Sequence, residues 1–413
     1  MDAGTRQIAF INTAHVFTHY GLLVLATAVL AIVQQDSARF GGEYGPILAL
    51  GTAMFVLYGL GALPMGTLAA RYGRKALMVA FFLGAGGSMA LAGLVSGPLG
   101  LAAALALMGA FSAIYHPIGT AIITEAGGDR VGRAMGVNGV FGNLGVALAP
   151  VATAFLAAQF GWRAAFLVPG LLCVAIGLLY LREPPFDAHA SGVRTRPFPT
   201  IPPAVVRRAV LSLLAIAMVS GLVFNAFTLL LPKLMEERLA SSPGLLPVVG
   251  LLAFLATICG GVTQFTVGRM IDTRTLKGVF MPMAIVQGPA LLALAFLDGW
   301  AVLPVSALVA AAIFGQVTVN ETMTARYVAP ELRAKLYSIR FTVGFLGAAC
   351  ASPLVGLLHA ATGNLSLAMV VLAGVAMVTL LCAAAFPNRP EELRPELWAK
   401  APGAAPAGAQ PAE

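Results

Sequence analysis

Two similar stretches of sequence decide the fold, GTLAARYGRK at residues 66–75 and GRMIDTRTLK at residues 268–277. Each follows a long apolar run and precedes another, so each is expected to form a short basic loop between two apolar segments. Gly66 and Gly268 are 202 positions apart. The same offset relates further glycines, namely Gly142 to Gly344, Gly145 to Gly347 and Gly161 to Gly363. An offset that recurs in loops and in apolar runs indicates that the chain contains one unit twice.

The composition excludes most soluble proteins. Of the 413 residues, 59% are apolar and 10% are charged, and the mean hydropathy is +0.88. A soluble domain carries about 25% charged residues, so this chain has too few charged residues to cover a surface exposed to water. The net charge of +8 does not indicate nucleic acid, because the Lys and Arg residues lie in short loops rather than on one polar face. We therefore expect a lipid bilayer as the surroundings and no nucleic-acid partner.

Twelve apolar runs are long enough to cross a bilayer. They lack the alternation of a β-strand, and a helix satisfies its own backbone in lipid, so we predict helices. The fold class expected is an all-α membrane protein of twelve transmembrane helices, arranged as two six-helix bundles related by a pseudo-two-fold repeat. The predicted spans are 8–33, 44–68, 77–96, 100–123, 134–158, 164–182, 209–231, 245–270, 278–297, 301–326, 335–359 and 365–387.

The basic residues predict the orientation. With these spans, 20 of the 25 Lys and Arg residues fall in segments on the side of the termini and four fall on the other side. Basic loops stay in the cytoplasm, so both termini are expected there. The polar segments divide the chain into an N-terminal bundle (1–182), a Pro- and Arg-rich cytoplasmic linker (183–208), a C-terminal bundle (209–387) and a tail expected to be disordered (388–413).

The two loops resemble the inner-loop motif of the major facilitator superfamily, G-x-x-x-D-R-x-G-R-K, which this family carries once in each half. The residues assigned to this motif are Gly66, Arg71, Gly73, Arg74 and Lys75 in the first loop and Gly268, Asp272 and Arg274 in the second, where Arg274 is displaced by one position from the motif arginine. Ala70 replaces the usual aspartate in the first loop. The resemblance implies a latch between the halves, in which the glycine lets two helices approach and the aspartate docks on a neighbouring helix end. The alternative is that the Lys and Arg residues only keep these loops in the cytoplasm. That would explain the basic residues but neither the glycine spacing nor Asp272.

A second motif lies in the predicted span 134–158. Gly136, Gly145 and Pro150 have the spacing of the antiporter motif of the same superfamily, G-x8-G-x3-G-P-x2-G-G, although alanine or threonine replaces the other glycines. This likeness favours export by antiport, and ordinary packing of small residues is the alternative. The stretch IYHPIG at residues 114–119 is loosely similar to the fosmidomycin-resistance branch of the family.

Polar side chains inside the predicted spans are the candidates for function, because ionisable groups are costly at membrane depth. His15 and His19 lie one helical turn apart and so share a face. By resemblance, the first, fourth, seventh and tenth spans line a central cavity, and most of the candidates fall there. The candidate substrate- or proton-binding residues are His15, His19, Tyr115, His116, Asn225, Gln316, Asn320, Glu321 and Arg340.

The roles of these residues stay open at this level. Either Glu321 or a histidine binds a coupling proton, or Glu321 and Arg340 form a fixed salt bridge between the tenth and eleventh spans. His15 and His19 suit a proton relay, cavity lining or helix-packing hydrogen bonds. Two histidines without a carboxylate or thiol are too few to predict a metal site, so none is expected.

The sequence predicts a secondary active transporter of a bacterial inner membrane that works by alternating access. We expect it to be a monomer that exports a small organic molecule in exchange for protons; the alternative is proton-coupled uptake of a small organic anion held by Arg340 and the histidines. No cofactor is expected, and the chain has no G-x-x-x-x-G-K-S/T stretch for ATP. No H-E-x-x-H motif or protease-like Ser-His pair supports an enzyme. A membrane sensor is not excluded by the sequence.

Overall fold

The computed structural model describes residues 3–127, 131–184, 199–239, 245–394 and 397–398, and the regular elements in these residues are all helices. Eleven helical stretches are long and apolar enough to cross a membrane, and a shorter apolar helix covers Ala164–Tyr180. Together they correspond to the twelve predicted spans. The central part of the predicted linker (185–198) and most of the predicted tail lie outside the described residues.

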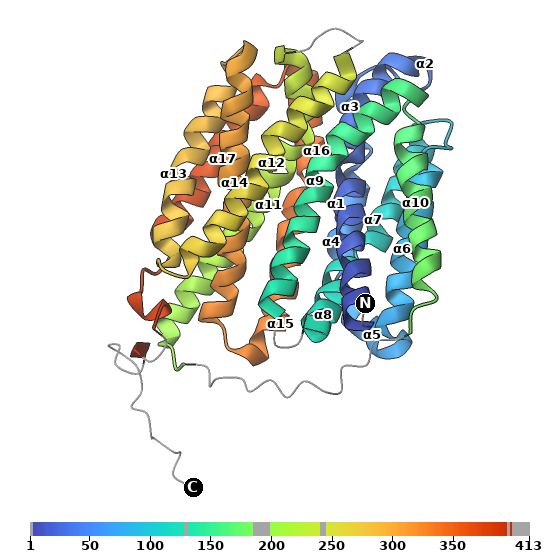
Figure 1. Ribbon diagram of the computed structural model, residues 1–413. Helices are drawn as coiled ribbons and strands as arrows, with labels where there is room; N and C mark the ends of the chain where they lie inside the picture. The colour runs from blue at the N-terminus through green and yellow to red at the C-terminus, as the bar shows by residue number, and fades with distance from the viewer. Residues whose placement is uncertain (1–2, 128–130, 185–198, 240–244, 395–396, 399–413) are drawn as a thin grey trace.

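The twelve spans form two bundles of six that stand side by side (Figure 1). The elements of the first bundle are α1 (Ala3–Gln35), α2 (Ser37–Phe40), α3 (Tyr44–Ala49), α4 (Thr52–Gly61), α5 (Met65–Tyr72), α6 (Arg74–Ala92), α7 (Pro98–Ser112), α8 (Tyr115–Gly127), α9 (Val131–Phe160) and α10 (Ala164–Tyr180). Those of the second are α11 (Pro203–Leu239), α12 (Leu246–Ile271), α13 (Leu276–Leu294), η3 (Gly299–Ala301), α14 (Val302–Tyr327), α15 (Pro330–Ala349), α16 (Ala351–Thr362), α17 (Ser366–Ala385) and η4 (Pro390–Glu392).

Three spans that the sequence predicts as single helices are interrupted. A proline ring clashes with the carbonyl four residues before it and removes a hydrogen-bond donor. Accordingly, α7 gives way to α8 at Ala113, four residues before Pro117, and α15 ends at Ala349, four residues before Pro353. The second span is divided into α3, α4 and α5. Helix α4 ends three residues before Pro64, whereas no proline accounts for the division between α3 and α4.

The predicted repeat is visible in the packing. A Cβ atom added to Gly145 of α9 would lie 2.4 Å from the carbonyl oxygen of Val16 in α1. A Cβ atom added to Gly347 of α15 would lie 2.3 Å from the carbonyl oxygen of Met218 in α11. Each residue of the second pair follows its counterpart in the first by 202 positions. The same close helix contact is therefore built twice, once in each bundle.

The two bundles share a core at one end only. We call the end at which α1 begins and α17 ends the terminal end (Figure 1). Away from it, one hydrophobic cluster includes residues of both bundles, whereas towards it the buried residues form two separate clusters, one in each bundle. At the joined end, Gly45 of α3 meets Gly356 of α16 backbone to backbone, and Gly250 of α12 meets Pro150 of α9.

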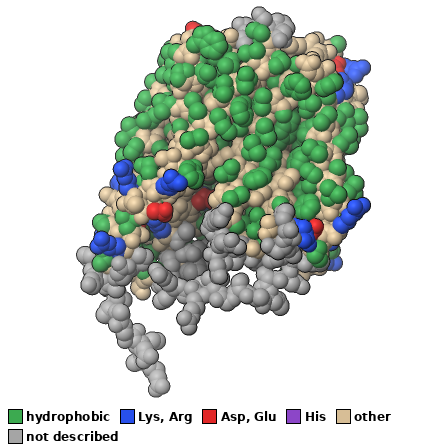
Figure 2. Space-filling view, in the orientation of Figure 1, with side chains coloured by type: hydrophobic (Ala, Val, Ile, Leu, Met, Phe, Trp, Pro, Cys, Tyr) green, Lys and Arg blue, Asp and Glu red, His purple; other side chains and the backbone are tan. Residues whose placement is uncertain are grey.

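The surface is that of a membrane protein. Figure 2 shows hydrophobic side chains covering the middle of the bundle, with Lys and Arg near its ends. Large apolar side chains such as Leu171, Leu211 and Val262 are more than half exposed. Exposed leucine and valine side chains on helices of this length suit lipid rather than water, so the chain is a multi-pass membrane protein.

Part of the segment expected to be a disordered tail packs against the second bundle. Glu392 of η4 is buried, accepts a hydrogen bond from the backbone N–H of Leu276 at 2.9 Å, and accepts another from the hydroxyl of Tyr327. Burial raises the pKa of this carboxyl group. The indole ring of Trp398 is also buried and lies beside Tyr327. These contacts tie residues after α17 to the terminal end of the second bundle.

A charged contact ties two loops of the first bundle together at the joined end. Asp36 accepts hydrogen bonds from Arg163 at 3.0 Å and from the Trp162 indole at 3.3 Å. Burial acts to raise the pKa of Asp36, but these hydrogen bonds and the charge of Arg39 outweigh it, so this pKa lies below the ordinary value of 3.8.

We expect Asp36→Asn to lower the free energy of unfolding at neutral pH by about 1–2 kcal/mol, the range of a partly exposed charge-assisted hydrogen bond. Because the folded-state pKa is lowered, the carboxylate stabilises the protein above pH 3.8 and this contribution is lost as the pH falls through the lower folded value. Thermal unfolding of the purified protein at pH 7 and near pH 3 measures this. Asp298→Asn is the control, because Asp298 also pairs with an arginine but is 74% exposed. An equal loss for both variants at pH 7 would contradict the prediction.

Candidate functional site: a histidine cluster beside an ion pair

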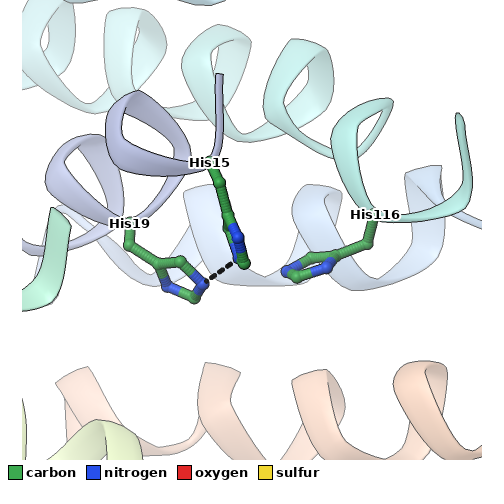
Figure 3. Close-up of side chains that lie close together, drawn as sticks. All are labelled: His15, His19 and His116. Carbon is green, nitrogen blue, oxygen red and sulfur yellow. Dashed lines mark hydrogen bonds between the residues drawn. The ribbon is translucent and has the colours of Figure 1, made fainter. Parts of the chain in front are cut away.

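Three histidines from two helices face one another inside the first bundle. His15 and His19 come from α1 and His116 from the first turn of α8 (Figure 3). The ring centroid of His15 lies 4.9 Å from that of His19 and 5.3 Å from that of His116, and the centroids of His19 and His116 are 5.7 Å apart. We call these three residues the histidine cluster. The structure thus brings together three of the predicted site residues.

Hydrogen bonds fix the ring of His15. Its Nδ1 atom lies 2.8 Å from the carbonyl oxygen of Asn138 in α9. A carbonyl oxygen only accepts, so Nδ1 carries the hydrogen and donates it. The Nε2 atom of His15 then has a free lone pair, which accepts the hydrogen bond from Nε2 of His19 at 3.1 Å. The Asn138 side chain in turn donates to Asn12 at 3.0 Å and to the hydroxyl of Tyr115 at 2.8 Å.

Glycine in α9 makes room for the cluster. A Cβ atom added to Gly142 would lie 2.5 Å from the ring of His15. The close contact at Gly145, one turn further along, holds α9 against α1. The placement of His15 therefore depends on small residues in the facing helix as well as on its own hydrogen bonds.

An ion pair of the second bundle is separated from the histidine cluster by one aromatic ring, that of Phe341. Nη2 of Arg340 in α15 is 2.9 Å from Oε1 of Glu321 in α14, which confirms that these two residues are partners. The Arg340 guanidinium lies over the ring of Phe341 at 5.2 Å, and this ring stacks on His116 with centroids 5.1 Å apart. The Arg340 side chain is 11% exposed and that of Glu321 is 46% exposed.

Tyr115, a fourth predicted site residue, packs directly on the cluster. It is buried, its ring stacks on that of His15 with centroids 4.7 Å apart, and its hydroxyl accepts a hydrogen bond from Asn138. The remaining candidates bond elsewhere. The amide of Asn225 donates to Gly221 of its own helix, and Gln316 donates to Gln287 of α13, so both bond within the second bundle. Asn320 is buried, and its side-chain oxygen has no partner among the described residues.

The glycines of the two inner loops do not mediate the close helix contact that the sequence analysis expects. A Cβ atom added to Gly66 or to Gly268 would meet nothing within 4 Å. The physical reason is the separation of the two cores at the terminal end, which leaves these residues without a facing helix. Gly136 is equally open, whereas Gly145 and Pro150 lie in close contacts between helices.

Other residues of the inner loops shape local turns. Gly73 ends α5 with φ of +79°, a conformation that glycine adopts without strain. Lys75 donates to the carbonyl of Leu181 at 3.0 Å, which joins the loop to the end of the sixth span. Arg71 lies over the ring of Tyr72, Arg74 begins α6, and Arg274 lies in the turn after α12. Asp272 is exposed at the end of α12.

Sequence reasoning missed two residues that organise the site. Asn138 is one of two asparagines in the apolar run 134–158, which is a signal that the sequence offers, but its contacts with His15 and Tyr115 join different helices. Nothing in the sequence marks Phe341 as a site residue, because aromatic residues are common in membrane spans. Its position between the histidine cluster and Arg340 appears only in the structure.

Comparison with known proteins settles the family. The family model of the Major Facilitator Superfamily matches residues 10–254 and again 245–410. The chain belongs to the major facilitator superfamily. Members of this superfamily are membrane transporters, and the double match agrees with the repeat seen in the packing. No curated protein sequence matches the chain.

Solved structures show the same fold. A bacterial homologue of the human lysosomal transporter Spinster, in an inward-facing and occupied conformation, is similar with a TM-score of 0.70 and 15% identity, over 94% of this chain and 96% of that one. The inward-facing, unoccupied form of the same homologue has a TM-score of 0.69 and 14% identity, over 97% of this chain and 98% of that one. The fucose:proton symporter of E. coli has a TM-score of 0.59 and 14% identity, over 94% of this chain and 100% of that one.

Proposed function

We propose that the chain is a proton-coupled secondary active transporter that works by alternating access, with both termini in the cytoplasm of a bacterium. The excess of Lys and Arg in the loops on the side of the termini supports this orientation. In that orientation the terminal end faces the cytoplasm, and a core shared only at the opposite end is an inward-facing arrangement. The inner-loop latch at Asp272 would then form in the other state, when the terminal ends of the bundles close.

One observation carries the proposal: the histidine cluster of the first bundle meets the Glu321–Arg340 pair of the second through the single ring of Phe341. Ionisable groups inside a membrane bundle are costly and mark ion or substrate pathways. Free imidazole titrates at about pH 6.5, so a histidine can take up and release a proton under ordinary conditions. Groups from both bundles are thus placed where a rocking motion would change their surroundings.

We propose export as the direction, with a small organic molecule leaving as protons enter. The close contacts at Gly145 and Pro150 support this, because they belong to the stretch that resembles the antiporter motif. Proton-coupled uptake of a small organic anion is the alternative. The guanidinium of Arg340 beside the cluster favours it.

A growth screen tests the direction. A bacterial host expresses the chain or an inactive variant and is grown with a panel of toxic compounds and with single carbon sources. Export predicts resistance to some compounds, and uptake predicts growth on a carbon source or greater sensitivity. Each hit is then measured in proteoliposomes with an imposed pH gradient. If no compound in a broad panel moves in either assay, the transport proposal is wrong.

Proton coupling predicts the behaviour of two variants. Glu321→Gln and His116→Ala should each lower pH-driven transport of the compound identified in the screen by about tenfold or more, a change of about 1.4 kcal/mol in the driving step. His359→Ala is the control, because His359 pairs with Glu237 at 2.9 Å and is absent from the cluster. If Glu321→Gln and His116→Ala both retain full pH-driven transport, neither residue carries the proton.

A further inference from the structure

The histidine cluster has the composition of a metal site. The ligand nitrogens of His15, His19 and His116 all lie within 4.8 Å of one another. Imidazole nitrogen is a preferred ligand of zinc and of its neighbours in the first transition row. The sequence showed only His15 and His19 on one helix face, and two histidines did not justify a metal site. The third ligand comes from α8 through the fold.

We propose that His15, His19 and His116 bind one divalent transition-metal ion of the zinc class. This inference does not depend on the transport proposed above, because it concerns binding by the folded chain alone. Zinc binds histidine nitrogen at about 2.0 Å, so two nitrogens of a tetrahedral site lie about 3.3 Å apart. The Nε2 atoms of His15 and His19 are already 3.1 Å apart. A modest movement of the His116 ring would complete the set.

The surroundings of His15 are those of a metal ligand. A ligating histidine usually donates its second ring N–H to a carbonyl or carboxylate, which fixes the tautomer and orients the ring. His15 does so through Nδ1 to the carbonyl of Asn138, and its Nε2 lone pair points to the cluster. Without a metal that lone pair accepts from His19. With a metal, His19 would carry its hydrogen on Nδ1 and offer Nε2 to the ion.

A buried hydroxyl beside the cluster is compatible with a bound ion. Tyr58 of α4 is 2% exposed, its ring lies 6.2 Å from that of His116, and its hydroxyl has no hydrogen-bond partner among the described residues. An unpaired buried hydroxyl costs free energy. Three protein ligands leave one position of a tetrahedral zinc ion open, and a water there could bond such a hydroxyl.

The nearby charges permit a cation. Phe341 lies between Arg340 and the cluster, and Glu321 pairs with Arg340. The carboxylate therefore offsets the guanidinium charge. The three histidines are neutral when they bind a metal, so no ligand has to bring a further positive charge next to the ion.

Zinc titration of the purified full-length chain tests the proposal. With the affinity tag removed, isothermal titration calorimetry should show one Zn²⁺ bound per chain. His15→Ala, His19→Ala and His116→Ala should each weaken this binding by about 100-fold or more, because loss of an outer partner alone costs 10–100-fold. His359→Ala, which removes a histidine outside the cluster, should leave the binding unchanged.

A second measurement separates binding from folding. Co²⁺ bound by nitrogen ligands in a tetrahedral site has a characteristic visible spectrum, which the wild-type chain should show and the His116→Ala variant should lack. Each variant is compared only if its thermal unfolding remains cooperative, and His116→Asn replaces any alanine variant that does not fold. Absence of stoichiometric Zn²⁺ binding by the folded wild-type chain, or equal binding by folded wild-type and His116 variants, would overturn the proposal. Failure here would leave the transport proposal intact, because transport is measured separately.

Discussion

Replacing Gly145 with alanine is expected to destabilise the protein, whereas the same change at Gly136 on the same helix is expected to stabilise it. A Cβ atom at position 145 would lie 2.4 Å from the backbone oxygen of Val16, and a backbone cannot swing aside as a side chain can. Such overpacking costs about 1–3 kcal/mol. At position 136 an added Cβ atom meets nothing within 4 Å, so alanine gains the helix preference of about 0.5–1 kcal/mol over glycine.

The measurement is thermal unfolding of both variants in the same detergent. Gly347→Ala provides a further check, because the twin contact in the second bundle predicts a loss of similar size. Gly145→Ala should also disturb the site, since it pushes α9, which carries Asn138, away from His15. The packing account is wrong if Gly145→Ala and Gly136→Ala shift the unfolding temperature in the same direction.

Exchanging the charges of Glu321 and Arg340 is expected to rescue the damage done by either single reversal. Glu321→Arg or Arg340→Glu places two like charges where an ion pair of 2.9 Å now lies. At about 4 Å such a repulsion is worth about 1–4 kcal/mol, and the 46% exposure of the Glu321 side chain favours the lower part of this range. The double variant restores an attractive pair, so its yield and unfolding temperature should return towards those of the wild type.

The same three variants separate the two roles left open for Glu321. If the pair is only a structural bridge between α14 and α15, the double variant should recover transport together with stability. If Glu321 also carries a proton at its own position, stability should recover while pH-driven transport stays low. Double and single variants that are equally unstable would show that the pair does not bind the two helices together.

Much of the fold could be predicted from the sequence because bilayer thickness and internal duplication leave strong signals. The constant offset between Gly145 and Gly347 reappears as two equal helix contacts. The helix interruptions before Pro117 and Pro353 agree with the clash of a proline ring with the carbonyl four residues earlier. Pro150, Pro169 and Pro232 nevertheless lie inside unbroken helices, so a proline alone does not decide where a span is interrupted. The prediction of unbroken spans missed the interruptions because apolar run length alone does not register such a break.

Less of the candidate site could be predicted from the sequence, because its contacts join helices that are distant in sequence. The spacing of His15 and His19 on one helix face was readable, but the meeting of both with His116 depends on how α8 packs against α1. The sequence leaves two roles open for Glu321, and the structure shows that it pairs with Arg340. The absence of a close contact at Gly66 and Gly268 reflects the conformation, in which the terminal ends of the two cores are apart.

The central claim is that two bundles rock about the polar groups between them, and distances measured at each end of the protein, in two separately labelled samples, test it most directly. Spin labels are placed on Tyr72→Cys and Thr273→Cys at the terminal end and, in a separate sample, on Ala38→Cys and Ala361→Cys at the joined end, all exposed positions. The exposed native cysteines, Cys259 and Cys350, and the partly exposed Cys382 are first replaced by serine. Pulsed electron paramagnetic resonance in proteoliposomes then follows both distances from about pH 5 to pH 8, where histidine changes charge. The account predicts two populations whose balance shifts with pH, so that the terminal-end distance shortens as the joined-end distance lengthens. A single distance at each end that stays the same over this range, or changes of the same sign at both ends, would contradict it.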